Sequence, residues 1–158
     1  MAQTVAKKPK LDQTVVIFHA SRKPNANGEL NWCETKIVEQ KMDLTAIQDL
    51  VGARIVTMLP CYRKTTLECY VDEEGLLNQN YARNDLAGGA LFMLGFGGGQ
   101  ALGCAYAGNV VVTGKKMRSL TAKQQAELKD AIEKYNRKDD FLFFSDVAKH
   151  HLRSASCK

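Results

Sequence analysis

The chain has 158 residues, which is enough for one ordinary domain with a buried core. Its 45% hydrophobic and 25% charged residues are typical of a soluble globular protein and exclude a disordered, collagen-like or coiled-coil chain. Lysine plus arginine exceed aspartate plus glutamate by 22 to 17, and the excess lies at the ends, within residues 1–10 and 134–158. The body between them is close to neutral.

The first half of the chain predicts a hairpin followed by a helix. A β-strand is predicted over 14–20, where β-branched and aromatic residues follow one another. Polar turn residues come next, and a returning strand is predicted over 35–42. A short helix is predicted over 43–52, because Asp43 can accept backbone N–H bonds at its start and Gly52 can take the left-handed conformation that ends it.

The second half predicts further strands and one clear helix. Strands are predicted over 53–59 and 65–72, and a short buried strand over 109–114. The last helix is predicted to begin at Thr121, which forms a T-x-x-Q capping box with Gln124.

Strands outnumber helices, and most strand pairs lack the helical crossover that a parallel sheet requires. The sequence therefore predicts an α+β fold: a single domain whose mostly antiparallel sheet has two or three helices packed on one face. The predicted organisation is a basic N-terminal tail (1–12), the α+β domain (13–136) and a Phe-rich, basic C-terminal interaction segment (137–158).

Residues 86–108 carry no charge and hold eight of the twelve glycines. The run of three glycines at 97–99 argues against a transmembrane helix, because glycine has a low helix propensity. The absence of the GK[ST] and dinucleotide-binding signatures argues against a phosphate-binding loop. The favoured interpretation is an apolar helix over 85–94, packed on the sheet, followed by a loop over 95–99. An apolar loop of this kind also suits a contact surface. No membrane insertion is expected.

No constellation of residues indicates catalysis. The five cysteines form no CxxC pair, and the N-terminus lacks the apolar core of a secretory signal, which together predict a reducing, intracellular setting. Adjacent histidines at 150–151 do not converge on a metal, and His19 has no partner nearby in the sequence. We therefore predict no catalytic residue, no cofactor, no metal and no enzymatic activity.

Two short basic clusters occur in the body of the chain. Arg63-Lys64 and Lys115-Lys116-Met117-Arg118 could meet phosphate, but both are predicted in loops with no interleaved aromatic residue beyond Tyr62. Nucleic-acid binding is therefore expected more through the basic tails than through the body.

Part of the chain resembles a family named as the domain of unknown function 3846, which is common in phages, large viruses and mobile elements. The resemblance covers about residues 43–125 and rests on the order and spacing of short stretches: 50–56, 72–77 with Asn84, 107–114, and Ser119-Leu120-Thr121. The chain departs from the family in its extended first hairpin, its triple glycine and its Phe-rich end. The resemblance implies a viral or mobile-element origin and supplies no activity or functional residue.

These observations lead to two functional hypotheses. The first is a non-enzymatic protein of a virus or mobile element that contacts other protein subunits, including a role as a minor structural component of a virus particle. The alternative is a small intracellular accessory protein that binds nucleic acid or nucleotides and interferes with host defence. The Phe-rich segment either covers the sheet edge or docks on a neighbouring subunit. The candidate partner contacts are Lys7, Lys8, Lys10, Phe96, Phe141, Phe143, Phe144 and Arg153.

Overall fold

The computed structural model describes residues 12–75, 82–97 and 106–137. These residues form an antiparallel five-stranded sheet with strand order β2-β1-β5-β4-β3, together with three α-helices and one 3₁₀ turn. The predicted single α+β domain with an antiparallel sheet is therefore confirmed. In chain order the elements are β1 (Gln13–Ala20), β2 (Asn31–Val38), α1 (Leu44–Val51), β3 (Val56–Met58), β4 (Leu67–Asp72), α2 (Asp85–Met93), β5 (Val110–Gly114), η1 (Lys115–Met117) and α3 (Ala122–Asn136).

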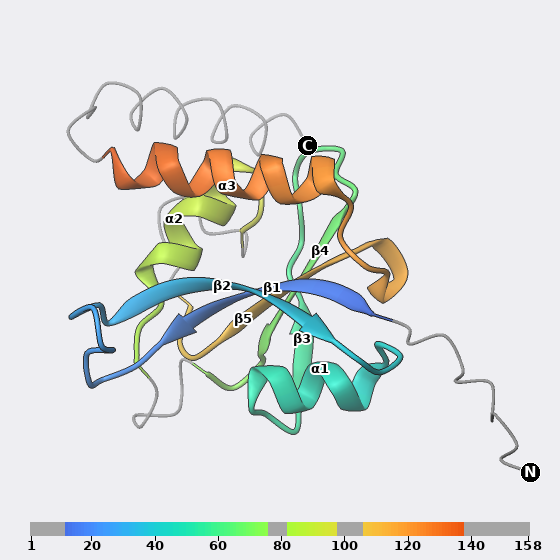
Figure 1. Cartoon of the computed structure of the whole chain (residues 1–158), viewed down its shortest axis with the longest axis horizontal. Helices are drawn as coiled ribbons and strands as arrows, with labels where there is room; N and C mark the ends of the chain where they lie inside the picture. Colours follow the sequence, from blue (N-terminus) through green and yellow to red (C-terminus); the bar gives the residue numbers. More distant parts are fainter. Residues whose placement is uncertain (1–11, 76–81, 98–105, 138–158) are drawn as a thin grey trace, which may run out of the picture.

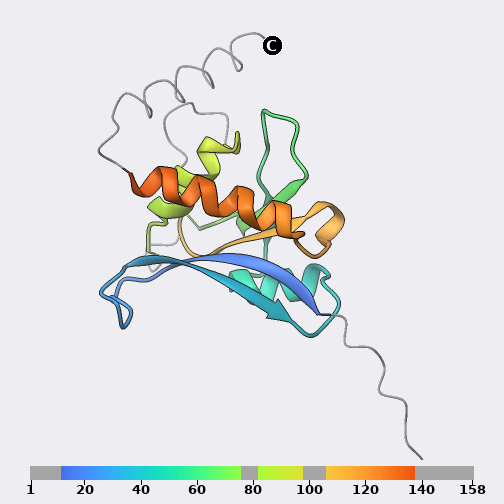
Figure 2. The same ribbon diagram turned by 45° about the horizontal axis from the view of Figure 1, so that its top comes forward.

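The helices cover both faces of the sheet. Helices α2 and α3 pack together on one face, while α1 lies on the opposite face beneath β4 and β5 (Figures 1 and 2). We call these the helix-pair face and the α1 face. The prediction of two or three helices on one face thus holds for two of them and is wrong for α1.

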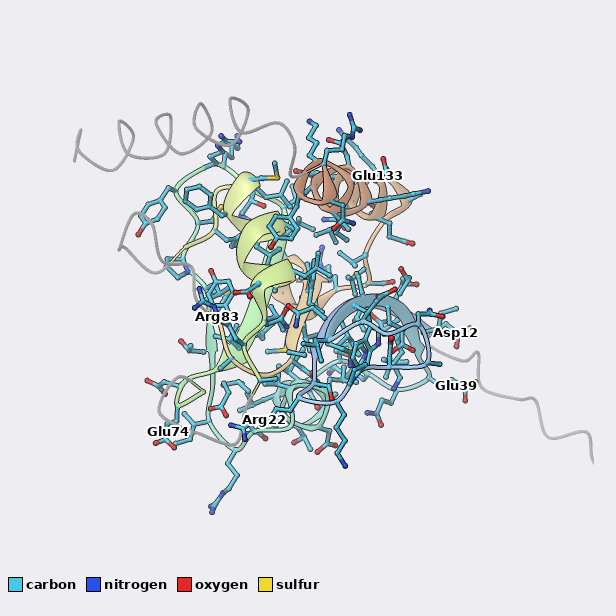
Figure 3. The ribbon with its side chains drawn as sticks, turned by 90° about the vertical axis from the view of Figure 1, so that its left-hand side faces the viewer. Asp12, Arg22, Glu39, Glu74, Arg83 and Glu133 are labelled. Carbon is cyan, nitrogen blue, oxygen red and sulfur yellow. The ribbon has the colours of Figure 1, made fainter. Side chains whose placement is uncertain are left out.

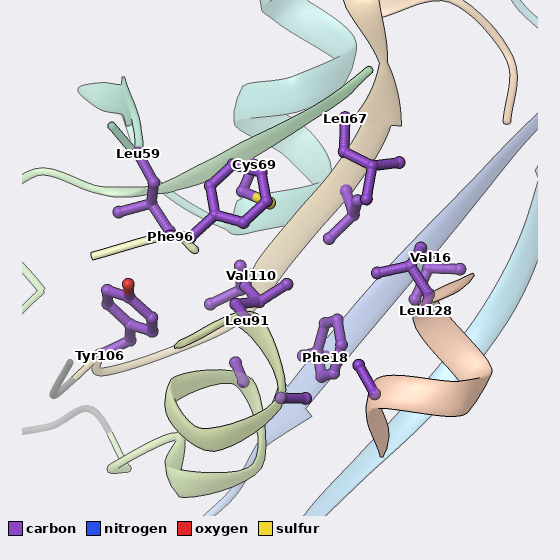
Figure 4. Close-up of a cluster of buried hydrophobic side chains, with 14 of the residues drawn as sticks. Val16, Phe18, Leu59, Leu67, Cys69, Leu91, Phe96, Tyr106, Val110 and Leu128 are labelled. Atoms are coloured by element: carbon purple, nitrogen blue, oxygen red, sulfur yellow. The ribbon is translucent and has the colours of Figure 1, made fainter. Parts of the chain in front are cut away.

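The larger core fills the space between the sheet and the helix pair. Alternate residues of a strand point to the same face, so Phe18, Cys69 and Val110 converge there beneath Leu91 of α2 and Leu128 of α3 (Figure 4). These five side chains are at most 1% exposed. The intervening strand residues point the other way and meet α1. Both faces of β1 and β5 are consequently buried at the centre of the sheet.

The capping residues predicted for α1 and α3 are found at the ends of these helices. The Asp43 carboxylate accepts the N–H of Ala46 at 2.9 Å, and Gly52 ends α1 with a φ of 79°. At the start of α3, Thr121 and Gln124 form the reciprocal capping box. Helix α2 ends at Met93, one residue earlier than predicted.

The first hairpin differs from its prediction. The returning strand is β2 at Asn31–Val38 rather than 35–42, because the loop closes earlier than expected. The side chain of Asn25 accepts N–H bonds from Asn27 and Glu29, and Gly28 takes a φ of 78°, so the chain reverses within a few residues. The predicted strand over 53–59 is also shorter and reduces to β3.

Asn84 connects three parts of the fold. It caps α2 through a 3.1 Å bond from the Ala87 N–H to its Oδ1, and its Nδ2 donates to the carbonyl oxygens of Phe18 and Gly108 at 2.8 and 2.9 Å. Its side chain is fully buried. One amide group therefore fixes α2 against β1 and the segment that leads into β5.

Candidate functional site

Strand β2 forms one edge of the sheet, and no strand of residues 12–75, 82–97 and 106–137 pairs with its outer side (Figure 1). It is eight residues long, whereas the opposite edge strand, β3, has three. The outer side of a strand presents unpaired N–H and C=O groups that can pair with another chain. Strand β2 is therefore the longest backbone surface available to a partner in the described part of the molecule.

The side chains of β2 alternate between the two faces. Cys33 packs against the core of the helix-pair face and Val38 packs against that of the α1 face, which places Thr35 and Ile37 on the first face and Glu34 and Lys36 on the second. The middle of the strand is exposed, and Ile37 is 61% exposed. The edge thus carries one acid, one base and a large apolar side chain at its centre.

His19 of β1 has a partner across the hairpin. Its Nε2 lies 2.7 Å from Oε2 of Glu34, and its ring stacks on Trp32 with a centroid separation of 5.0 Å. Sequence reasoning missed this cluster because the wrong limits of the returning strand gave the wrong register. The neighbouring thiol of Cys33 points to the opposite face, so the imidazole–carboxylate pair has no nucleophile beside it on β2.

A groove of about 860 Å³ lies between the first hairpin loop, α2 and the end of α3. Its partly buried apolar residues, which pack against the main core, are Cys33, Leu86, Ile132 and Tyr135. Arg22 and Arg83, both labelled in Figure 3, also line it, as do Glu29 and Asp85. Arg83 pairs with Asp85, so the charges of the groove are balanced and favour neither an anion nor a cation.

The described thiols are poor nucleophiles at neutral pH. Burial, together with the charge of Glu34, raises the pKa of Cys33 to about 11. Burial also raises the pKa of Cys61, and it raises that of the fully buried Cys69 well above its ordinary value. Because the thiolate is the reactive form, none of these three groups is activated for covalent chemistry.

Phe96 is not available to a partner, so its selection as a contact residue was wrong. It is 1% exposed and packs in the main core, and a bridge to Cys61 holds its backbone. Although Phe96 adjoins a glycine-rich stretch, its ring is part of the hydrophobic core and not of the surface. The other candidate contacts, Lys7, Lys8, Lys10, Phe141, Phe143, Phe144 and Arg153, lie outside the described residues, as do 98–99 of the predicted loop.

The β3–β4 loop, which carries the first basic cluster of the body, lies against η1, which carries the second. The N–H of Lys115 donates to the carbonyl oxygen of Thr66 at 3.1 Å, which brings the β3–β4 loop against η1. The side chain of Gln124 donates to both oxygens of Thr66 at 3.0 Å, which adds the first turn of α3. The spacing of residues in the sequence does not predict this proximity, because the proximity depends on the pairing of β4 with β5.

Comparison of the chain with protein-family models, curated proteins and solved structures gave no match. The resemblance to the domain of unknown function 3846 stays a prediction. None of the described helices is both long and apolar enough to cross a bilayer. The same described residues contain no group of three or more histidine, cysteine, aspartate or glutamate side chains that could hold a metal ion.

Proposed function

We propose that the protein acts through contacts with other protein subunits rather than through catalysis, and that β2 is the strand that makes them. The observation that carries this proposal is the long, exposed edge of β2. Its proposed occupant is a second copy of the chain, joined by antiparallel pairing of the two β2 strands. A minor structural component of a virus particle is the role we propose within this class, because the resemblance to a family of phages, large viruses and mobile elements implies a viral or mobile-element origin.

Charge selects the register of this pairing. In a symmetric antiparallel pair, the strand crosses its own copy at one residue, and residues equally far from that centre face each other. A centre at Thr35 places Glu34 opposite Lys36 of the copy twice and sets Cys33 opposite Ile37. A centre at Glu34 would oppose two glutamates, and a centre at Lys36 would oppose two lysines. Like charges directly opposite destabilise a sheet, so the Thr35 register is favoured.

Reversing either charge tests the pairing and its register together. Light scattering during size-exclusion chromatography should show a wild-type dimer, and Lys36→Glu or Glu34→Lys should each weaken association by about 10- to 100-fold because two attractive pairs become repulsive. An equimolar mixture of the two variants should form a heterodimer, since every facing pair is then again of opposite charge. The double variant E34K/K36E should also dimerise.

Two substitutions on exposed residues of α3 serve as controls. Glu133→Lys and Lys129→Glu make the same charge changes away from β2 and should leave the dimer intact. A monomeric wild-type chain, or single variants whose mixture stays monomeric while E133K and K129E behave as wild type, would remove self-pairing of β2 as the basis of the function. Absence of the protein from any assembled particle would separately contradict the structural role.

A further inference from the structure

We propose that one end of the sheet binds the phosphate backbone of a nucleic acid. This surface, which we call the basic end, lies where β4 begins and β5 ends. It consists of Lys64 in the β3–β4 loop, three residues in and after η1, and one in the first turn of α3. Its residues are Lys64, Lys115, Lys116, Arg118 and Lys123, and all of them are exposed.

The basic end is a fixed structure rather than a set of separate loops. The bonds from Lys115 and Gln124 to Thr66 join its three segments. The turn itself is closed by a 2.8 Å bond from the N–H of Gly114 to the carbonyl oxygen of Arg118. On the other side, the hydroxyl of Ser119 accepts the N–H of Thr14 in β1 at 2.9 Å. Because the backbone that carries the cations is already fixed, its three segments lose less conformational entropy when they bind an anion.

The positive charges of this end are only partly offset within the described residues, where the charge of Lys115 interacts with the carboxylate of Glu68. None of its five cations forms an ion pair with a described carboxylate. The nearby carboxylate of Glu68 instead accepts the backbone N–H groups of Lys116 and Met117 at 2.8 and 3.3 Å and the hydroxyl of Tyr70 at 2.6 Å. The ammonium and guanidinium groups are therefore left to solvent or to an external anion.

The backbone of the turn supports a role for its side chains. Lys116 and Met117 both have a φ of 57°, in the left-handed region where glycine is favoured. This conformation is energetically unfavourable for a residue other than glycine. The chain places a lysine there and offsets the cost with the bonds to Glu68. Strain that the fold maintains in this way is a reason to look for function at the turn.

Arg63 does not belong to the basic end, although it adjoins Lys64 in the sequence. Its guanidinium donates to the carbonyl oxygen of Met93 at 3.3 Å, at the C-terminal end of α2. A cation at this position satisfies a free carbonyl group and complements the helix dipole. Arg63 therefore has a structural role at the end of α2, and we do not count it among the residues that bind phosphate.

A nucleic acid fits this surface better than an anionic membrane does. Membrane-surface binding combines cations with apolar side chains that enter the bilayer interface. The large apolar residues that are most exposed in the described chain are Leu30, Ile37, Leu44, Ile55 and Met58, and none belongs to the segments that form the basic end. Cations without adjacent apolar residues suit a hydrophilic chain of phosphates.

The test compares two variants that each remove one lysine and one arginine from the full-length chain. K115Q/R118Q changes the basic end, and R22Q/K23Q changes the exposed first hairpin loop at the other end of β1. Fluorescence anisotropy measures binding to a short random-sequence DNA duplex between about 50 and 200 mM salt. Vesicles containing phosphatidylserine provide the second probe, and circular dichroism checks that both variants are folded.

We expect the wild-type protein to bind the duplex with an affinity that falls as salt rises. K115Q/R118Q should reduce the slope of log K against log salt by about 1.8, or about 0.9 for each lost phosphate contact. R22Q/K23Q should keep the wild-type slope. The proposal is overturned if the wild type does not bind DNA at low salt, if both variants lose binding equally, or if binding is confined to the vesicles. None of these outcomes depends on whether β2 pairs with a second copy.

Discussion

Replacing Asn84 by alanine is expected to lower the free energy of unfolding by about 3–7 kcal/mol. The substitution leaves the carbonyl oxygens of Phe18 and Gly108 without their donor, and each unsatisfied buried group costs about 1–3 kcal/mol. It also removes the N-cap of α2, which contributes about 1 kcal/mol. Urea unfolding followed by circular dichroism measures the change.

Asn27→Ala is the matched control for this measurement. Asn27 is exposed in the first hairpin loop, and its side chain makes no hydrogen bond within the described residues. Its replacement should change stability by less than about 0.5 kcal/mol. If Asn84→Ala were equally mild, the amide of Asn84 would not hold α2, β1 and the start of β5 together.

The second large effect is expected at Glu68. Partial burial acts to raise the pKa of this carboxyl, but the hydroxyl of Tyr70 and the N–H groups of Lys116 and Met117 together bring its pKa below the ordinary value. Glu68→Ala leaves these three donors without their acceptor and should lower the free energy of unfolding by about 2–4 kcal/mol.

Lys116→Gly should instead raise the free energy of unfolding by about 1 kcal/mol, because glycine relieves the left-handed strain.

The lowered pKa also predicts a dependence of stability on pH. A carboxyl with a lower pKa in the folded state contributes stability that is present above the pKa of the unfolded chain and is lost as pH falls through the folded pKa. Wild-type protein should therefore lose more stability than Glu68→Gln between about pH 5 and pH 3. Glu74→Gln, which removes an exposed carboxylate from the turn after β4, should follow the wild-type curve. Parallel curves for wild type and Glu68→Gln would contradict the assignment.

Local chemistry made part of the fold predictable. Both α1 and α3 were located correctly because their capping residues act within one turn of the helix. The face on which α1 packs was not predicted, since periodicity shows which side of a helix is buried but not which side of the sheet it meets. A signal was nevertheless present: Val15 to Phe18 form a continuous apolar run, which is typical of a strand covered on both faces.

The candidate surfaces depended on pairings that no local pattern encodes. The contact between His19 and Glu34 follows from the register of β1 and β2, which the side chain of Asn25 sets by shortening the loop. The basic end follows from the pairing of β4 with β5, which brings Thr66 beside Lys115. Phe96 was misjudged for the opposite reason. Its glycine-rich surroundings suggested a loop surface, whereas its side chain is buried in the main core.

The strand order also has a consequence for the way the chain folds during synthesis. Strand β1 lies in the interior of the sheet, and its inner neighbour is β5, with Val16 opposite Val112. The first hairpin can form as soon as β2 leaves the ribosome, but the inner side of β1 has no partner until most of the chain has been translated. Long-range pairing of this kind slows folding and leaves strand edges exposed to aggregation. During that interval the nascent hairpin has two open edges, and a chaperone or an early-binding subunit would protect it.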